Sequence, residues 1–187
     1  MNRIKNCIQK TTLLFIVSLM FTLTSRSQSN NWVVNSSAVV FEIKNAKALV
    51  TGNFTGLTAS ITFNPLALST SKIEAKIAVK TIKTGIEMRD NHLKKSEYFN
   101  AEKFPEISIV TNKISKIGDN QFVAKCTLTM KGKSKEVDLP FTYSEKDNKA
   151  SFIGTLKINR LDFGVGSSSV IMAKDLIVKI TVYTSRK

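Results

Sequence analysis

The segment KIEAKIAVK, residues 72–80, shows the pattern that decides the fold. Apolar side chains occupy every second position, and charged side chains occupy most of the positions between them. Successive side chains of a β-strand point to opposite faces, so this alternation predicts a strand with one buried face and one face in water. The residues expected on the buried face are Ile73, Ala75, Ile77 and Val79.

The same alternation recurs on both sides of this segment, from residue 36 to near the end of the chain. In QFVAKCTLTMK, residues 121–131, Phe122, Ala124 and Cys126 share one face. Short turn-like breaks separate the runs, so most neighbouring strands are joined as hairpins. Such neighbours must be antiparallel, because a parallel pair needs a crossover of roughly a dozen residues or more. We expect eight or nine strands.

The apolar faces of these strands must be hidden, either inside a closed barrel or between the two sheets of a sandwich. The inward-facing sets mix small residues, such as Ala75 and Gly154, with large ones, such as Phe41 and Phe63. A wall of small residues opposite large ones leaves space, which favours a closed barrel. A barrel of about eight strands is wide enough either to be filled by its own side chains or to hold one slender ligand.

The N-terminal residues 1–27 have the features of a secretory signal peptide. Basic residues precede the apolar run LLFIVSLMFTL, residues 13–23, and small polar residues follow it. This run is too short to span a bilayer, which needs about 20 residues. Ser25 and Ser27 suit the positions before a cleavage site, and the only cysteine in this region, Cys7, lies before the run, unlike that of a lipoprotein. We expect cleavage after Ser27, leaving residues 28–187 as a single periplasmic or secreted domain.

The charge of the expected mature chain is strongly positive. The signal peptide removes four basic residues and no acid, which lowers the formal charge from +14 to +10. In an exported protein this excess favours transient contact with an anionic membrane surface, although a soluble, self-repelling surface is the simpler interpretation. The lysines do not alternate with aromatic residues as in a base-stacking surface, so we expect no nucleic-acid partner.

One polar segment interrupts the strand pattern. This insert, TGIEMRDNHLKKSEYFNAEKFPEI at residues 84–107, holds His92, the only histidine. Asp90 or Asn91 can cap a helix, and Phe104-Pro105 returns the chain to an extended form. The pattern therefore predicts a short helix in one connection, at the rim of the barrel or across its mouth. Within it, we interpret Glu87, Arg89 and Asp90 as a local ion-pair and capping network.

Catalysis by this insert is not expected. A nucleophile working with His92 would have to be Cys126 or a serine of GVGSSS, residues 164–169. Cys126 lies in mid-strand among apolar neighbours, where a thiol is usually inert, and the serines lack the G-x-S-x-G context of a nucleophile elbow. One histidine with scattered carboxylates gives no metal-ligand spacing. We expect a protein that is not an enzyme, without a metal or a cofactor; an enzyme centred on His92 is the alternative.

The insert also resembles the YceI-like proteins, a family named for binding polyisoprenoid lipids. The resemblance rests on RDNHL and the aromatic-proline pair of the insert. It continues in GNFTGLTASITFNP, LTMKGKSKEVDLPF and INRLDFGVGSSS, and covers about residues 36–183. It implies an exported, eight-stranded lipocalin-like barrel that sheathes an isoprenoid chain, without established catalysis. The residues that carry over directly are Arg89, Asp90, His92, Leu93, Phe99 and Pro105.

Together these observations predict an all-β protein, a closed eight-stranded antiparallel lipocalin-like barrel with a short helix in one connection. We expect it to bind and shield an isoprenoid lipid, such as a quinone or a polyprenyl carrier, as a carrier or storage protein. The expected cavity liners are Phe41, Ile73, Ala75, Ile77, Phe122, Ala124, Cys126, Leu156, Ile158, Val178 and Ile180. The residues expected at the cavity mouth are Arg89, Asp90, His92, Leu93 and Phe99.

A strand pattern does not separate a hollow barrel from a filled one, so core packing is the alternative role of each liner. The corresponding functional alternative is a solid-cored, exported interaction or stress-response module that acts through its basic surface.

Overall fold

The computed structural model describes residues 30–187, so the predicted signal peptide lies outside the described residues. Nine strands and one α-helix follow one another along the described chain, with three short 3-10 helices between them. The strands are β1 (Asn31–Asn45), β2 (Ala48–Phe54), β3 (Thr58–Thr62), β4 (Lys72–Ala78), β5 (Glu106–Gly118), β6 (Gln121–Met130), β7 (Lys133–Lys146), β8 (Lys149–Asn159) and β9 (Met172–Arg186). The helices are η1 (Leu68–Thr70), η2 (Val79–Thr81), α1 (Glu87–Leu93) and η3 (Arg160–Phe163).

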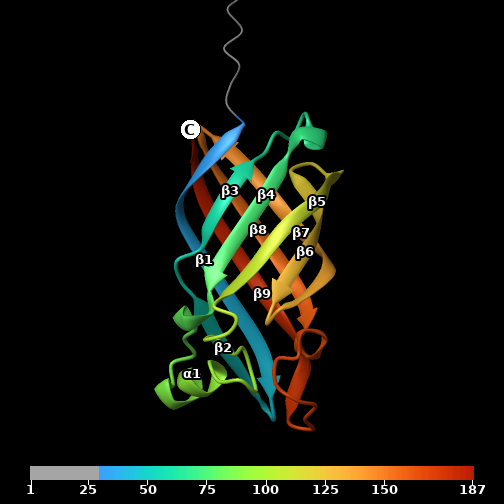
Figure 1. The fold of residues 1–187 in the computed structure, drawn as a ribbon. Coiled ribbons are helices and arrows are strands. Elements are labelled where there is room, and N and C mark those ends of the chain that lie inside the picture. Colours follow the sequence, from blue (N-terminus) through green and yellow to red (C-terminus); the bar gives the residue numbers. More distant parts are fainter. Residues whose placement is uncertain (1–29) are drawn as a thin grey trace, which may run out of the picture.

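The strands close into a barrel, as Figure 1 shows. Each strand from β3 to β9 pairs antiparallel with the next, and β1 closes the ring by pairing with both β9 and β3. This ring has eight strands. The ninth strand, β2, pairs with the second half of β1, on the same side of β1 that pairs with β3 at its first residues. The predicted all-β, eight-stranded antiparallel barrel is therefore confirmed.

Tight turns join the later strands as hairpins. Two residues connect β6 to β7 and two connect β7 to β8, because Met130 pairs with Lys133 and Lys146 with Lys149. Both residues of each turn have positive φ angles, for example 51° and 60° at residues 147 and 148. Such turns match the twist of the flanking strands and favour glycine, asparagine and aspartate, which the turns at 131–132 and 147–148 largely supply.

A cluster of rings fills the end of the barrel where β1 begins and β9 finishes. We call this cluster the aromatic plug. The closest ring centroids, those of Phe63 and Tyr143, are 4.8 Å apart, and every ring of the plug is buried. Because aromatic side chains packed edge-to-face or offset fill space densely, this half of the barrel is solid. The plug consists of Trp32, Phe63, Phe122, Phe141, Tyr143 and Phe152.

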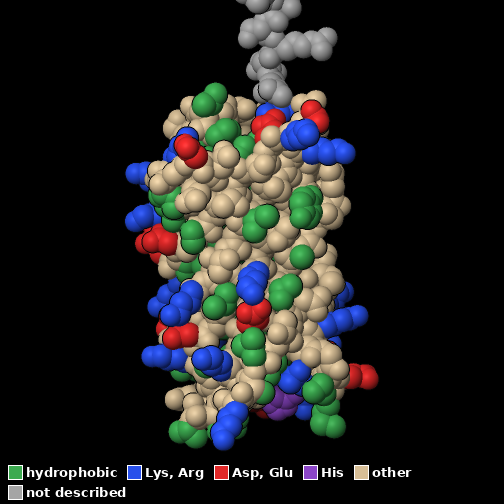
Figure 2. Space-filling view, turned by 180° about the vertical axis from the view of Figure 1, so that it is seen from behind, with side chains coloured by type: hydrophobic (Ala, Val, Ile, Leu, Met, Phe, Trp, Pro, Cys, Tyr) green, Lys and Arg blue, Asp and Glu red, His purple; other side chains and the backbone are tan. Residues whose placement is uncertain are grey.

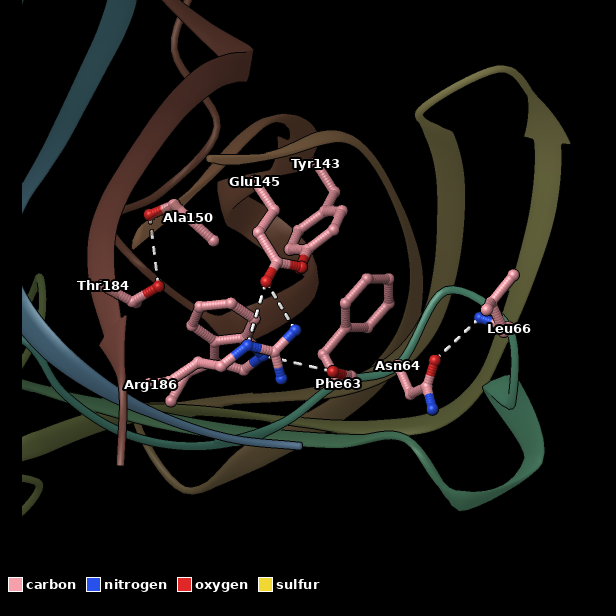
Figure 3. Close-up of polar contacts among 9 residues, drawn as sticks. Phe63, Asn64, Leu66, Tyr143, Glu145, Ala150, Thr184 and Arg186 are labelled. Carbon is pink, nitrogen blue, oxygen red and sulfur yellow. Dashed lines mark hydrogen bonds and ion pairs between the residues drawn. The ribbon is translucent and has the colours of Figure 1, made fainter. Parts of the chain in front are cut away.

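Polar contacts hold the outer side of the plug, as Figure 3 shows. Arg186 lies over the Trp32 ring, 4.5 Å from its centroid, and pairs with Glu145, which also accepts a hydrogen bond from the Tyr143 hydroxyl. The Trp32 indole donates to the carbonyl of Phe63 at 3.1 Å. The polar atoms of the plug are therefore paired, and the end of the barrel is sealed.

The insert lies at the opposite end of the barrel from the plug (Figure 1). Its α1 is the predicted short helix, and that prediction is confirmed. The helix starts at Glu87 with Ile86 in the capping position, and no side chain caps it, so the prediction of Asp90 or Asn91 as the cap is wrong. Among the described residues, no helix has both the length and the apolar character needed to cross a bilayer.

Candidate functional site

An apolar cavity of about 270 Å³ occupies the half of the barrel that the plug leaves open. Strands β1, β2, β4, β5, β6, β8 and β9 contribute to its wall, and the insert lies along one side. The volume is just below the usual range for ligand pockets, about 300–1,000 Å³. The space therefore suits a slender molecule.

Seven of the predicted liners lie in the wall of this cavity. They come from β1, β4, β8 and β9, and each occupies an inward position of its strand, as the alternation predicts. Whether they contact a ligand stays a prediction. The seven are Phe41, Ala75, Ile77, Leu156, Ile158, Val178 and Ile180.

Four predicted liners, Ile73, Phe122, Ala124 and Cys126, do not reach the cavity. Phe122 is part of the plug, and the other three pack in the same cluster. These four have the predicted inward orientation but lie too far toward the plugged end. They are core residues in this structure, and the cavity wall on β6 begins only at Leu128.

Burial of Cys126 also changes its chemistry. Removal from water, with the charge of Asp138 as a smaller cause, raises the pKa of its thiol to about 11. The thiolate is the nucleophilic form, so this cysteine is unreactive near neutral pH. The serines at 167–169, the other candidate nucleophiles, lie exposed on the loop after η3.

Four of the five predicted mouth residues line the cavity: Arg89, His92, Leu93 and Phe99. His92 is exposed, and its ring packs edge-on against Tyr98, with 5.0 Å between the ring centroids. No group of three histidine, cysteine, aspartate or glutamate side chains within residues 30–187 could hold a metal ion.

The fifth predicted mouth residue, Asp90, is not in the cavity wall but binds Thr84, which is. Its carboxylate accepts hydrogen bonds from the Thr84 backbone N–H at 2.8 Å and from the Thr84 hydroxyl at 2.5 Å. Arg89 donates from Nε to the same hydroxyl at 2.7 Å and from Nη2 to the Thr84 carbonyl at 2.8 Å. The predicted ion-pair and capping network of Glu87, Arg89 and Asp90 is wrong in its contacts: within residues 30–187 these side chains form no ion pair with one another, and none of them caps α1. Arg89 and Asp90 instead both bind Thr84, and this contact fixes the start of the insert.

Arg160, a cavity-lining side chain that is only 4% exposed, is not among the predicted site residues. Its guanidinium donates to the carbonyls of Ala173 at 2.9 Å, Val165 at 2.8 Å and Ser167 at 2.9 Å, and more weakly to Met172 at 3.4 Å. No carboxylate of residues 30–187 forms an ion pair with it. The residue holds the loop at 161–172 in place and leaves a positive charge beside the cavity.

A sequence signal for Arg160 existed. It continues the inward alternation of β8 beyond Leu156 and Ile158, so its side chain faces the interior. A charged residue at an inward position is informative, because a buried charge must find partners. Other missed liners of the same end include Phe54, Tyr98 and Leu176.

The insert is tied to the loop after η3. The Gly166 N–H donates to the Glu97 carbonyl at 2.9 Å, and the Lys131 ammonium donates to the carbonyls of Gly164 at 2.6 Å and Glu97 at 3.3 Å. A Cβ atom at Gly166 would lie 2.8 Å from Nη1 of Arg160, and the φ angle there is +69°, so any other residue would strain the backbone and displace the guanidinium. We call this set of contacts the loop latch; it fixes two sides of the mouth relative to each other.

A closed antiparallel barrel that is plugged at one end and hollow at the other defines a lipocalin-like barrel with an internal, ligand-sized cavity. The family model of the YceI-like domain matches residues 32–184, and the chain belongs to this family.

Comparisons with individual proteins agree with this placement. A UPF0312 protein of Shewanella denitrificans is 24% identical over 168 residues, which cover 78% of this chain and 88% of that protein. The crystal structure of BcnA from Burkholderia cenocepacia has a TM-score of 0.76 and 25% identity, covering 79% of this chain and 95% of BcnA. A domain of Saccharophagus degradans described as polyisoprenoid-binding has a TM-score of 0.66 at 12% identity, covering 84% of this chain and 98% of that domain, and shares the fold.

Proposed function

We propose that this protein binds the tail of an isoprenoid lipid in the apolar cavity and shields it from water, as a carrier or storage protein without catalysis. The observation that carries the proposal is the cavity itself, which has an apolar wall and most of its polar side chains near the mouth. The structural likeness to the Saccharophagus degradans domain supports the same ligand class. We propose that it acts in the periplasm or outside the cell, and the expected signal peptide supports this location.

The apolar wall is sufficient as a source of affinity. Burying about a dozen methylene equivalents at roughly 0.8 kcal/mol each contributes about 10 kcal/mol. This offsets much of an association cost of about 4–15 kcal/mol. Because the tail supplies most of this free energy, recognition of the head group is loose.

The plug limits how much tail the cavity holds. On β9 the wall extends from Met172 to Ile180, and the next inward residue, Val182, already belongs to the plug's core cluster. Between Met172 and Leu176, β9 has two residues more than the facing part of β1, so the regular strand β1 gives the depth. Its wall segment runs from Val39 to Asn45, and a rise of about 3.3 Å with a tilt of about 40° gives roughly 15 Å. An isoprene unit adds four bonds, or about 5 Å of extended chain. About three isoprene units therefore fit, and a longer tail protrudes.

Arg89 is the side chain best placed to contact the head group. It lines the cavity and uses Nε and Nη2 on Thr84, which leaves its Nη1 donors for an oxygen acceptor. A quinone carbonyl or a phosphate carries such acceptors. A head group at this position would lie at the mouth, beside the exposed His92.

Organic extraction followed by mass spectrometry tests the proposal. Protein purified without detergent and then incubated with geranylgeraniol is extracted, and the released lipid is identified and quantified. We expect wild type to release an isoprenoid. Ala75→Trp should release at least tenfold less, because Ala75 lines the cavity and an indole there fills it. Ala124→Trp would overpack the plug instead, since Ala124 is buried in that cluster.

Lys157→Trp is the matched control. Lys157 is exposed and lies between two inward residues of β8, so the same indole is added to the outer face of the barrel. This variant should retain wild-type lipid content, and both variants should unfold cooperatively. An empty wild-type protein, or equal lipid in folded Ala75→Trp, would contradict the proposal.

A further inference from the structure

Two groups of exposed apolar side chains stand at the mouth end of the barrel. The insert tip comprises Ile86 and Met88, which are 53% and 83% exposed. The loop tip comprises Leu49, Val170 and Ile171, which are 60%, 104% and 61% exposed. Figure 2 shows hydrophobic side chains at both lower corners of the molecule, at the same end as the histidine. None of the five residues lines the cavity, so the proposed ligand site does not account for them.

Both tips have fixed positions on the barrel. A backbone hydrogen bond of 2.5 Å from Ala46 to Ile171 joins the turn between β1 and β2 to the loop before β9, and this contact assembles the loop tip. The insert tip is held by the Thr84 network and by the antiparallel bridge between Asn53 and Lys83. The two tips therefore form a firm apolar rim beside the mouth.

Basic side chains accompany the tips. Lys83 and Lys95 flank the insert tip in the sequence, and Lys47 and Lys174 flank the loop tip; all four are exposed. Two exposed carboxylates, Glu87 between the insert-tip residues and Asp175 next to Lys174, offset part of this charge. The attraction to anions therefore comes from the excess of lysines and from the net charge of +10 on residues 28–187. Exposed aliphatic side chains among lysines are typical of surfaces that enter the interface of an anionic bilayer.

We propose that the insert tip and the loop tip dock into an anionic lipid bilayer, with the cavity mouth facing the membrane. The inference rests on the proposed function in one respect: a tail that moves directly from the bilayer into the cavity avoids exposing its apolar surface to water. Docking itself depends only on the rim and on the lysines around it.

Co-sedimentation with vesicles tests docking. The vesicles contain either phosphatidylcholine alone or phosphatidylcholine with phosphatidylglycerol. We expect wild type to bind the anionic vesicles and the double variant Met88→Asp, Val170→Asp to bind at least tenfold more weakly, because it places charge where apolar side chains would enter the bilayer. Leu66→Asp is the matched control, since Leu66 is 95% exposed at the plugged end, where Figure 3 shows it. This variant should bind like wild type.

The docking inference is overturned if wild type does not bind anionic vesicles, if it binds neutral vesicles equally well, or if Leu66→Asp loses as much binding as the double variant. Delivery of geranylgeraniol in detergent separates docking from cavity binding. The double variant should take up detergent-borne lipid like wild type but extract it from vesicles at least tenfold more slowly. Failure of wild type to bind lipid from detergent would count against the proposed function, whereas loss of vesicle binding alone would count against docking.

Discussion

At the residue scale, inward positions on neighbouring strands have different roles. Ala75 on β4 lines the cavity, whereas Ala124 and Cys126 on β6 are packed into the plug cluster. Arg160, at the end of β8, carries a buried charge that four backbone carbonyls satisfy. The environment of each side chain therefore decides its role. Ala75 leaves space for a ligand, Cys126 is an unreactive core thiol, and Arg160 fixes the neighbouring loop.

The buried thiol gives a prediction for the protein without residues 1–27, in which Cys126 is the only cysteine. Its pKa of about 11 leaves about one thiol in a thousand ionised at pH 8, far fewer than for an ordinary thiol with a pKa of about 8.5. Cys126 is also only 1% exposed, so the reagent cannot reach its sulfur in the folded state. We therefore expect no reaction of native protein with an aromatic disulfide reagent at pH 8 over an hour, and one thiol per chain in denaturant. Rapid labelling of the native protein would show that Cys126 is accessible.

The raised pKa of Cys126 also makes the free energy of unfolding depend on pH. Folding favours the protonated thiol, so the contribution of this shift is fully present below the unfolded pKa and is lost as the pH rises from there toward 11. The free energy of unfolding should therefore fall in that alkaline range.

At the element scale, the mouth depends on segments that are far apart in the sequence. The loop latch connects the insert, the β6–β7 turn and the loop after η3 through Glu97, Lys131 and Gly166. The barrel strands position these segments, and the latch then holds them against one another. The insert is thus a braced part of the cavity wall.

Gly166→Ala tests the loop latch. The substitution adds a Cβ atom 2.8 Å from Arg160 Nη1 at a φ angle of +69°, so it combines backbone strain with a clash. Gly56→Ala is the matched control, because Gly56 has a φ angle of +72° but open space around it. We expect each variant to lose about 1–2 kcal/mol from strain, and Gly166→Ala to lose at least about 1 kcal/mol more from the clash. Urea unfolding measures both, and equal losses would show that the latch tolerates the added group.

The strands and the two faces of each strand could be predicted from the sequence, because side-chain alternation follows directly from the β-pleat. The position of a residue along the barrel axis could not. Ala75 and Ala124 have the same local pattern, and only the pairing register of distant strands places one in the cavity and the other in the plug cluster. The insert was recognisable by its polarity, but the meeting of Glu97 with Gly166 depends on the closed barrel.

At the scale of the whole molecule, the two halves of the barrel interior have different roles. The plugged half buries aromatic rings and supplies close packing, and its outer polar groups are paired. The other half keeps a cavity of about 270 Å³ between strands that the plug holds together. The alternative of a solid core therefore applies to one half of the barrel only. A hollow half that ends at a solid plug predicts an upper limit on the length of tail that the protein can bury.

Titration with isoprenoid alcohols of increasing length tests this central claim most directly. We expect the affinity to rise at least tenfold with each added isoprene unit, because each buries several carbon atoms at roughly 0.8 kcal/mol per methylene equivalent. The rise should stop at about three units, the number that fits the depth estimated from the strand rise and tilt. A steady rise to eight units would show that the plug opens to admit the tail, and no binding at any length would contradict the account of the hollow half.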